Sequence, residues 1–180
     1  NSANIDFIGT GPDYKTVHKP LIKKAGQTQI AYLGYTSLLA GSLGAKEAEP
    51  AIAVLDTNNN VFEDIKTAKS LADIVVVSIH WGNEYEIKES EFQKTTAHAL
   101  IDAGADIIVG HHPHVVQPLE QYGDGFIIYS LGNFVFDQNF SEDTKEGGVL
   151  KVVIKNKKIE SVEKLKIRFN GNYQPFLAES

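Results

Sequence analysis

The sequence lacks two residue types altogether, cysteine and methionine. Without cysteine, the chain can have no disulfide, no thiolate metal ligand and no cysteine nucleophile. This absence fits a reducing compartment and fits equally well many bacterial cell-envelope proteins, so it leaves the compartment open. Because the first residue is Asn1 and not a methionine, we expect the chain to be part of a longer product.

Positive charge and long apolar runs are also scarce. The net charge of -6 argues against nucleic acid as a partner, because binding phosphates needs a basic surface. No apolar run approaches the roughly 18 residues of a membrane span, and no signal-peptide pattern is visible. A serine-hydrolase elbow of the form G-x-S-x-G is missing as well. The chain is 42% hydrophobic and 22% charged, which predicts a soluble globular protein, and its 180 residues suit one domain, residues 1–180.

The middle of the chain alternates between helical and strand patterns. Residues 60–73 and 90–104 have apolar residues at helical spacing, with Asn60 as a cap for the first helix and a Ser90/Gln93 capping box for the second. Residues 73–80 and 105–110 are continuous apolar runs, which are typical of strands buried on both faces. This order predicts a parallel sheet with right-handed helical crossovers.

The flanking segments predict further strands. We expect a short strand at 5–8, two strands joined by a turn at 25–28, and a surface loop over 37–60. A third sheet strand is expected at 126–133, and residues 147–169 predict an antiparallel hairpin that turns near 156–158. The predicted fold class is α/β, with a parallel or mixed sheet and a C-terminal antiparallel hairpin.

Histidines are concentrated at the predicted strand ends. His80 closes one buried strand, and His111, His112 and His114 directly follow the next. Ligands of open α/β sheets gather beyond the carboxyl ends of the strands, and an extended two-residue spacing points both rings to one side. Imidazole binds zinc, iron and other divalent metals. We therefore interpret His80, His112 and His114 as metal ligands and His111 as orienting a ligand or contacting substrate; the alternative is a capped turn with structural histidines.

Other polar residues share this predicted edge. Glu84 follows His80 closely and is a candidate ligand, general base or hydrogen-bond anchor, or else an ordinary loop carboxylate. Asn83 and Asn133 are candidates for contacting substrate, although asparagine is also common in strand-end turns. Trp81 is interpreted as a packing residue and Asp137 as a weaker candidate. Two further histidines, in a polar hairpin and in a helix, are interpreted as structural: His18 and His98.

The C-terminal hairpin is basic. Between Lys151 and Arg168 basic residues outnumber acidic ones by five. Such an excess can attract an anionic polymer or a membrane surface, and it is also common on solvated hairpin faces.

Three motifs together resemble a known family. The stretches VSIHWGNEYE at 77–86, LIDAGADIIVGHHPHVVQPLE at 100–120 and IIYSLGNFVFDQ at 127–138 resemble the bacterial capsule-synthesis family, the CapA/PgsA poly-gamma-glutamate biosynthesis proteins. The resemblance extends from Ile5 to about Val153. That family is similar to the calcineurin-like metallophosphoesterases. The resemblance therefore implies part of a metallophosphoesterase-like α/β/β/α sandwich with metals at the strand ends.

The resemblance also implies roles for the candidate residues. His80 matches an isolated histidine ligand, and His112 and His114 match a terminal H-x-H pair. The implied cofactors are two divalent metal ions, manganese, iron or zinc, which would activate water and clamp a phosphate-like group. His111 or Glu84 would then shuttle a proton as the catalytic groups.

The chain departs from the family pattern in its first half. An aspartate in a strand-end "GD" and a later "NNH" motif are both missing, since GDG at 123–125 lies in a turn and NNN at 58–60 opens a helix. The resemblance thus implies the C-terminal portion of the domain and an incomplete two-metal site. Either another polypeptide supplies the first half, or this portion binds metal weakly or not at all.

Three functions remain open from the sequence. The first is a metal-dependent hydrolase acting on a phosphoester or amide bond. The second is a non-catalytic cell-surface component that binds or guides an anionic polymer, and the third is a plain binding module with structural histidines. Family resemblance implies a cell-envelope location, a membrane anchor in the full-length protein and other capsule-synthesis membrane components as partners. An incomplete sheet edge would also favour a homo-oligomer.

Overall fold

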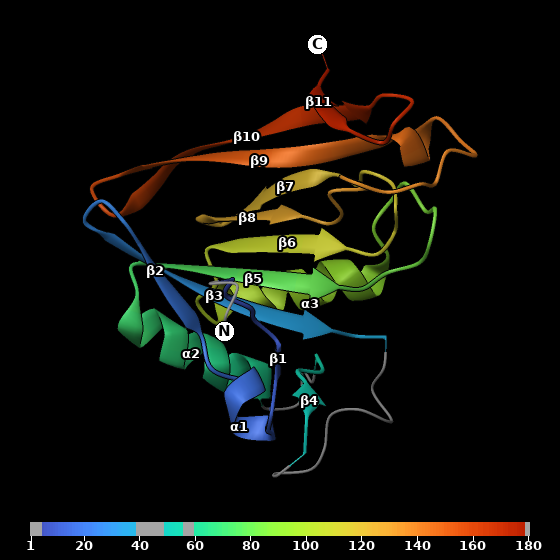
Figure 1. Ribbon diagram of the computed structural model, residues 1–180. Coiled ribbons are helices and arrows are strands. Elements are labelled where there is room, and N and C mark those ends of the chain that lie inside the picture. The colour runs from blue at the N-terminus through green and yellow to red at the C-terminus, as the bar shows by residue number, and fades with distance from the viewer. Residues whose placement is uncertain (1–4, 39–48, 56–59, 179–180) are drawn as a thin grey trace.

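A mixed β-sheet forms the centre of the computed structural model, which describes residues 5–38, 49–55 and 60–178 (Figure 1). Its strand order within the described residues is β2-β3-β5-β6-β8-β7. Strands β3, β5, β6 and β8 run parallel, and the outer pairs β2–β3 and β7–β8 are antiparallel. The predicted parallel or mixed sheet is therefore confirmed. The strand bounds are Leu21–Ala25 (β2), Thr28–Thr36 (β3), Ile74–His80 (β5), Ile107–His111 (β6), Leu119–Tyr122 (β7) and Gly125–Ile128 (β8).

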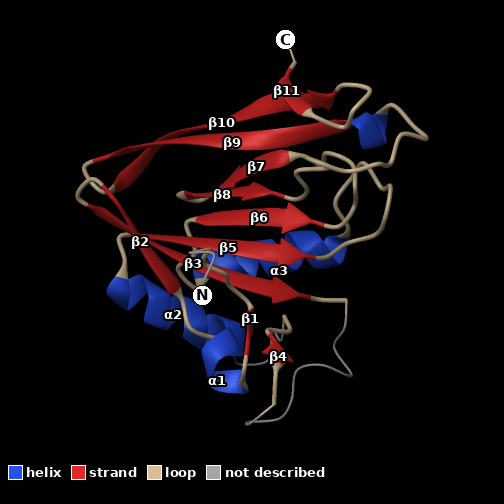
Figure 2. Ribbon diagram, viewed as in Figure 1, coloured by secondary structure: helices blue, strands red, loops and turns tan. Residues whose placement is uncertain are grey.

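Two helices cover one face of this sheet (Figure 2). Helix α2 spans Asn60–Leu71 and helix α3 spans Glu91–Asp102, as the apolar spacing predicts. The predicted Ser90/Gln93 capping box is present at the start of α3. Buried residues of both helices share one core with the sheet: Val61, Ile65, Ala68, Ala97, Leu100, Val75, Val77, Ile79, Ile108 and Ile127.

The predicted C-terminal hairpin is present. Strand β9, Glu146–Lys155, pairs antiparallel with β10, Lys158–Phe169, and a short strand β11, Pro175–Leu177, adds to the outer edge. Asn156 and Lys157 have φ angles of 51° and 66°, which make the tight turn between the long strands. A 3-10 turn, η1, at Asp143–Lys145 leads into β9.

The predicted strand at 5–8 is wrong. These residues are irregular, and the side chains of Ile5 and Phe7 are 68% and 60% exposed. The nearby pairing is instead between the two-residue strands β1, Thr10–Gly11, and β4, Ala51–Ile52. A short apolar run becomes a strand only where a partner ladder is available, and no strand ladder includes 5–8 among the described residues.

The predicted surface loop over 37–60 is wrong for residues 51–55, whereas the described residues 37–38 and 49–50 are irregular. Residues 51–55 pass through the core, with Ala51, Ala53 and Leu55 buried. The Thr36 amide donates to the Ala53 carbonyl at 3.0 Å, and the Leu55 amide donates to the Thr36 carbonyl at 2.8 Å. Burial alternates at 51, 53 and 55, but the sequence does not show this period, because Ile52 and Val54 between them are apolar as well. Residues 39–48 and 56–59 lie outside the described part of the chain.

Smaller differences concern element ends. The predicted strand at 126–133 is regular only to Ile128, because Pro118 in the facing segment has no N–H to continue the ladder. Asn60 is the first residue of α2, and its side chain donates to the Tyr14 hydroxyl, so the predicted cap is wrong. The short helix α1, Tyr14–Val17, and strand β7 were not predicted.

Hydrogen bonds around the Glu120 carboxylate lead to a prediction about stability. The Glu120 carboxylate accepts a hydrogen bond from the Tyr129 hydroxyl at 2.6 Å and lies 3.0 Å from His98 Nε2. The Tyr129 hydrogen bond, followed by that of His98, lowers the pKa of Glu120. A lowered carboxyl pKa contributes stability above its unfolded value, and this contribution is lost as the pH falls through the folded value.

We expect Tyr129→Phe to lower the free energy of unfolding by about 1.5–3 kcal/mol at neutral pH, the range for a hydrogen bond to a charged group. The difference from the parent chain should shrink as the pH falls below the ordinary glutamate pKa of about 4.3 and through the lowered pKa of Glu120. Urea unfolding at neutral and acidic pH measures both effects. Tyr122→Phe is the control, because the Tyr122 hydroxyl makes only an exposed 3.3 Å contact with Asp102. A loss that is equal at both pH values would contradict the role given to Glu120.

Candidate metal centre

The predicted histidines come together at one edge of the sheet. His80 ends β5 and His111 ends β6, and the two are register partners in the parallel ladder. His112 and His114 follow directly in the next loop. The ring centroids of His80 and His112 are 4.6 Å apart, and those of His112 and His114 are 5.9 Å apart. Parallel pairing thus brings side chains 32 to 34 positions apart to one place.

Glu84 completes a group with the spacing of metal ligands. One ligand atom each of Glu84, His112 and His114 lies within 4.8 Å of the others. The Glu84 Oε1 to His114 Nε2 distance is 4.0 Å. His80 lies outside this tight group and next to His112. Asn83 is exposed in the same loop as Glu84, and Asp137 is exposed in the loop after β8.

The backbone of the histidine loop is strained in a way that serves this arrangement. His112 and His114 have φ angles of 101° and 61°, in the region that favours glycine. Such residues cost about 1–3 kcal/mol each and persist only where the surroundings hold them. Two backbone hydrogen bonds do so here: the Trp81 amide donates to His111 at 3.0 Å, and the Tyr85 amide donates to Pro113 at 2.8 Å.

Contacts from two other loops, those after β5 and β8, fix the His114 ring. Its Nδ1 lies 2.9 Å from Asn133 Oδ1, and Asn133 is buried. The rings of Tyr85 and Phe136 flank it with centroid distances of 6.1 and 5.0 Å. The Nε2 atom remains directed to Glu84, so His114 has one nitrogen in a hydrogen bond and one at the ligand group.

The local electrostatics favour neutral imidazoles. Burial, followed by the neighbouring histidines, lowers the pKa of His80, and burial followed by His80 lowers the pKa of His111. Burial also lowers the pKa of His112, against an opposing effect of the Glu84 carboxylate. Neutral imidazole is the form that binds metal, and one carboxylate with imidazoles suits zinc, iron or manganese. The donor set therefore fits a divalent metal.

The residues that the sequence assigned to structural roles have such contacts, and some supporting residues were not predicted. Trp81 is fully buried and its Nε1 donates to the Tyr129 carbonyl at 3.0 Å, as expected of a packing residue. His18 pairs with Asp64 at 2.6 Å, and His98 belongs to the Glu120 network. The sequence interpretation missed the residues that support the site from a later segment, such as Phe136 and Thr144. Their approach depends on tertiary folding and leaves no local spacing signal.

Comparison with known proteins identifies the family. The family model described as "Bacterial capsule synthesis protein PGA_cap" matches residues 1–138. The chain belongs to this capsule-synthesis family. It is 40% identical over 153 residues to the capsule biosynthesis protein CapA of Bacillus anthracis, and 42% identical over 154 residues to the PGA biosynthesis protein CapA of Bacillus subtilis. These matches cover 82% and 84% of this chain but 36% and 40% of the relatives. The predicted family is confirmed, and the chain spans well under half the length of these relatives.

Two solved structures have a similar fold. The sulfate thiohydrolase SoxB of Thermus thermophilus matches with a TM-score of 0.53 and 18% identity, over 81% of this chain and 24% of that one. A putative 5'-nucleotidase of Staphylococcus aureus matches with a TM-score of 0.50 and 17% identity, over 90% of this chain and 30% of that one. At these identities the matches concern the fold alone. They confirm the predicted fold class of this family member.

Proposed function

We propose that the chain carries the divalent-metal site of a hydrolase that acts in capsule or poly-gamma-glutamate biosynthesis. The observation that carries the proposal is the approach of Glu84, His112 and His114 to within 4.8 Å at the carboxyl edge of the sheet. His80 is the further ligand, since its ring lies beside that of His112. The metal is manganese, iron or zinc, with two ions in the complete domain.

The surrounding residues have separate tasks in this proposal. A divalent metal at the site would supply Lewis-acid chemistry, polarising the substrate and lowering the pKa of water. We propose that His111, partly buried at the same edge, moves protons near the reacting group, and that the exposed Glu84 either shares this task or binds the metal. Asn83 contacts substrate from the loop after β5. Asn133 holds His114 in place from a buried position, and the substrate contact that the sequence suggests for it stays a prediction.

Family membership supports the proposed setting and the choice of substrates. Members described as capsule or PGA biosynthesis proteins act in building the cell envelope, and we propose a phosphoester or a γ-glutamyl amide as the bond that is hydrolysed. Within the described ranges, no helix is long and apolar enough to cross a membrane. The membrane anchor and the other capsule-synthesis membrane components belong to the proposal for the longer protein.

Guidance of an anionic polymer without catalysis is the second candidate. A Mycobacterium tuberculosis relative, 29% identical over 75% of this chain, is described as a probable polyglutamine synthesis accessory protein. However, fewer basic side chains of the hairpin are available to bind a polymer than its composition suggests. Five of its basic side chains have carboxylate partners within 4.0 Å: Lys151, Lys155, Lys157, Lys166 and Arg168. This pairing favours the metal-dependent function.

Metal content and substrate class test the proposal together. We expect the chain, purified without chelator or metal-affinity resin, to hold at least about one manganese, iron or zinc ion by elemental mass spectrometry. His114→Ala should lose the metal, whereas the control His98→Ala should keep it, because His98 lies in the Glu120 network. The loaded chain should hydrolyse either bis-p-nitrophenyl phosphate or γ-glutamyl-p-nitroanilide. Absence of metal from the parent chain, or equal metal in His114→Ala, would contradict the site.

A further inference from the structure

The hydrogen bonds behind His114 determine which of its two nitrogens carries the proton. A backbone carbonyl can only accept hydrogen bonds, and the Thr144 carbonyl lies 3.0 Å from one end of the Asn133 amide. That end must therefore be the NH2 group, which donates. The other end is the oxygen, and it lies 2.9 Å from His114 Nδ1. Because an amide oxygen only accepts, His114 Nδ1 must carry the proton.

A second contact supports the same orientation of the amide. The Asn133 NH2 group also lies 3.3 Å from Gln138 Oε1, and Gln138 Nε2 donates to the Tyr85 hydroxyl at 3.1 Å. Reversing the Asn133 amide would set its oxygen against the Thr144 carbonyl and would leave Nδ1 facing a donor. Asn133 is only 5% exposed, so water offers little compensation for such a mismatch.

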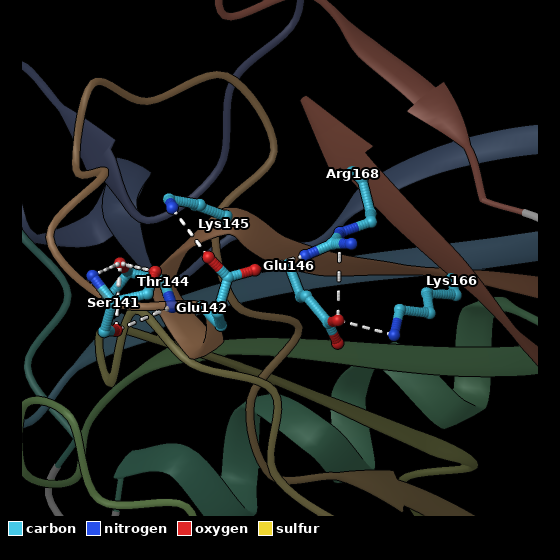
Figure 3. Close-up of polar contacts among 7 residues, drawn as sticks. All are labelled: Ser141, Glu142, Thr144, Lys145, Glu146, Lys166 and Arg168. Atoms are coloured by element: carbon cyan, nitrogen blue, oxygen red, sulfur yellow. Dashed lines mark hydrogen bonds and ion pairs between the residues drawn. The ribbon is translucent and has the colours of Figure 1, made fainter. Parts of the chain in front are cut away.

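The Thr144 carbonyl is itself held in place by the turn before β9 (Figure 3). The Thr144 amide donates to Ser141 Oγ at 3.2 Å, and the Thr144 hydroxyl donates to the Ser141 carbonyl at 3.1 Å. Ion pairs fasten both ends of this turn to β10. Arg168 contacts Glu142 at 2.7 Å, and Lys166 contacts Glu146 at 2.5 Å. The hairpin therefore orients a carbonyl that faces the metal-centre loop.

Gly147 permits the approach of the two segments. A Cβ atom at Gly147 would lie 1.8 Å from the Asn133 carbonyl oxygen, a distance that no side chain can occupy. At the adjacent Gly148, the nearest heavy atom to a Cβ would be a flexible Leu131 side-chain carbon at 3.2 Å. The two glycines are neighbours on β9, yet only the first touches the Asn133 backbone.

We propose that Asn133 and the Thr144 carbonyl form a relay that fixes His114 as the Nδ1-protonated tautomer, leaving Nε2 as the nitrogen that faces Glu84. Asn133 is thus a positioning residue. The Thr144 backbone carbonyl orients its amide, and the absence of a side chain at Gly147 lets the two segments approach. The inference about the tautomer stands on hydrogen bonding alone. Its consequence for metal affinity rests on the proposed function, because Nε2 must be unprotonated to bind an ion.

Long-range 1H–15N NMR of the histidine side chains tests the tautomer directly. At alkaline pH, where imidazoles are neutral, we expect a protonated Nδ1 and an unprotonated Nε2 for His114 in the metal-free parent chain. Gly147→Ala should give a mixture of tautomers, and Gly148→Ala should match the parent. Cobalt(II) titration by absorbance should show affinity roughly 10–100-fold weaker for Gly147→Ala than for Gly148→Ala.

The outcomes separate the relay from the metal site. An Nε2-protonated or mixed His114 in the parent chain overturns the relay, whatever the metal affinity. A Gly147→Ala chain that keeps the parent tautomer and cobalt affinity overturns the role given to the Asn133–Thr144 contact. If the parent shows the Nδ1-protonated form but binds no cobalt, the relay stands and the proposed metal site fails. Thermal unfolding of both alanine variants establishes that the comparison is made on folded protein.

Discussion

Replacing His112 by glycine is expected to remove most of the proposed hydrolytic activity without lowering the free energy of unfolding. The substitution deletes one imidazole from the ligand group of Glu84, His112 and His114. Metal-ion catalysis supplies several kcal/mol of transition-state stabilisation, so kcat/KM should fall by roughly a thousandfold. The effect should be large, because among the described residues His112 both belongs to the tight ligand group and has its ring beside that of His80.

Glycine is chosen because it separates function from stability. His112 has a φ angle of 101°, which strains any residue with a Cβ. Glycine relieves that strain, of about 1–3 kcal/mol, and this relief offsets its greater freedom in the unfolded chain, worth about 1 kcal/mol. We therefore expect urea unfolding of His112→Gly to give a free energy equal to or above that of the parent.

A matched comparison comes from His112→Ala, which loses the same imidazole but keeps the strain. Both variants should lose activity equally, although the alanine variant should be the less stable of the two. If His112→Gly stays active and only the less stable His112→Ala loses activity, then His112 stabilises the fold and does not act as a ligand.

Local signals account for the parts of the structure that the sequence predicts well. The Ser90/Gln93 capping box and the apolar runs of β5 and β6 depend on residues a few positions apart, and each is present. The position of His80 and His111 at a common edge follows from the rule that parallel strands end on the same side. Those elements carry the candidate ligands, so the location of the site was accessible from the sequence.

Long-range contacts explain what could not be predicted. Residues 51–55 enter the core through bonds to Thr36, across a segment whose composition suggests a loop. Asn133 meets His114 across 19 positions and Thr144 across 11 positions, and neither spacing follows a helix or strand period. The prediction for residues 5–8 failed in the opposite direction, since this favourable local pattern belongs to none of the strand ladders in the described part of the chain.

Replacing Gly110 by alanine is expected to destabilise the protein more than Tyr129→Phe or His112→Ala. A Cβ at Gly110 would lie 1.8 Å from the Tyr129 carbonyl oxygen and 2.5 Å from Trp81 Nε1. Those two atoms are hydrogen-bonded to each other at 3.0 Å, and both residues are fully buried. Neither can move without separating β6 from its neighbours, so the added methyl group has no room.

Overpacking of this kind costs about 3 kcal/mol or more, because a backbone carbonyl cannot rotate away as a flexible side chain would. Gly171→Ala is the control, since a Cβ there would meet no atom within 4 Å, and it should change stability by less than about 0.5 kcal/mol. Urea unfolding of both variants measures the difference. A Gly110→Ala chain as stable as Gly171→Ala would mean that the Trp81–Tyr129 contact does not fix the end of β6. Because His111 and His112 follow Gly110 directly, the same substitution should also weaken metal binding in any protein that remains folded.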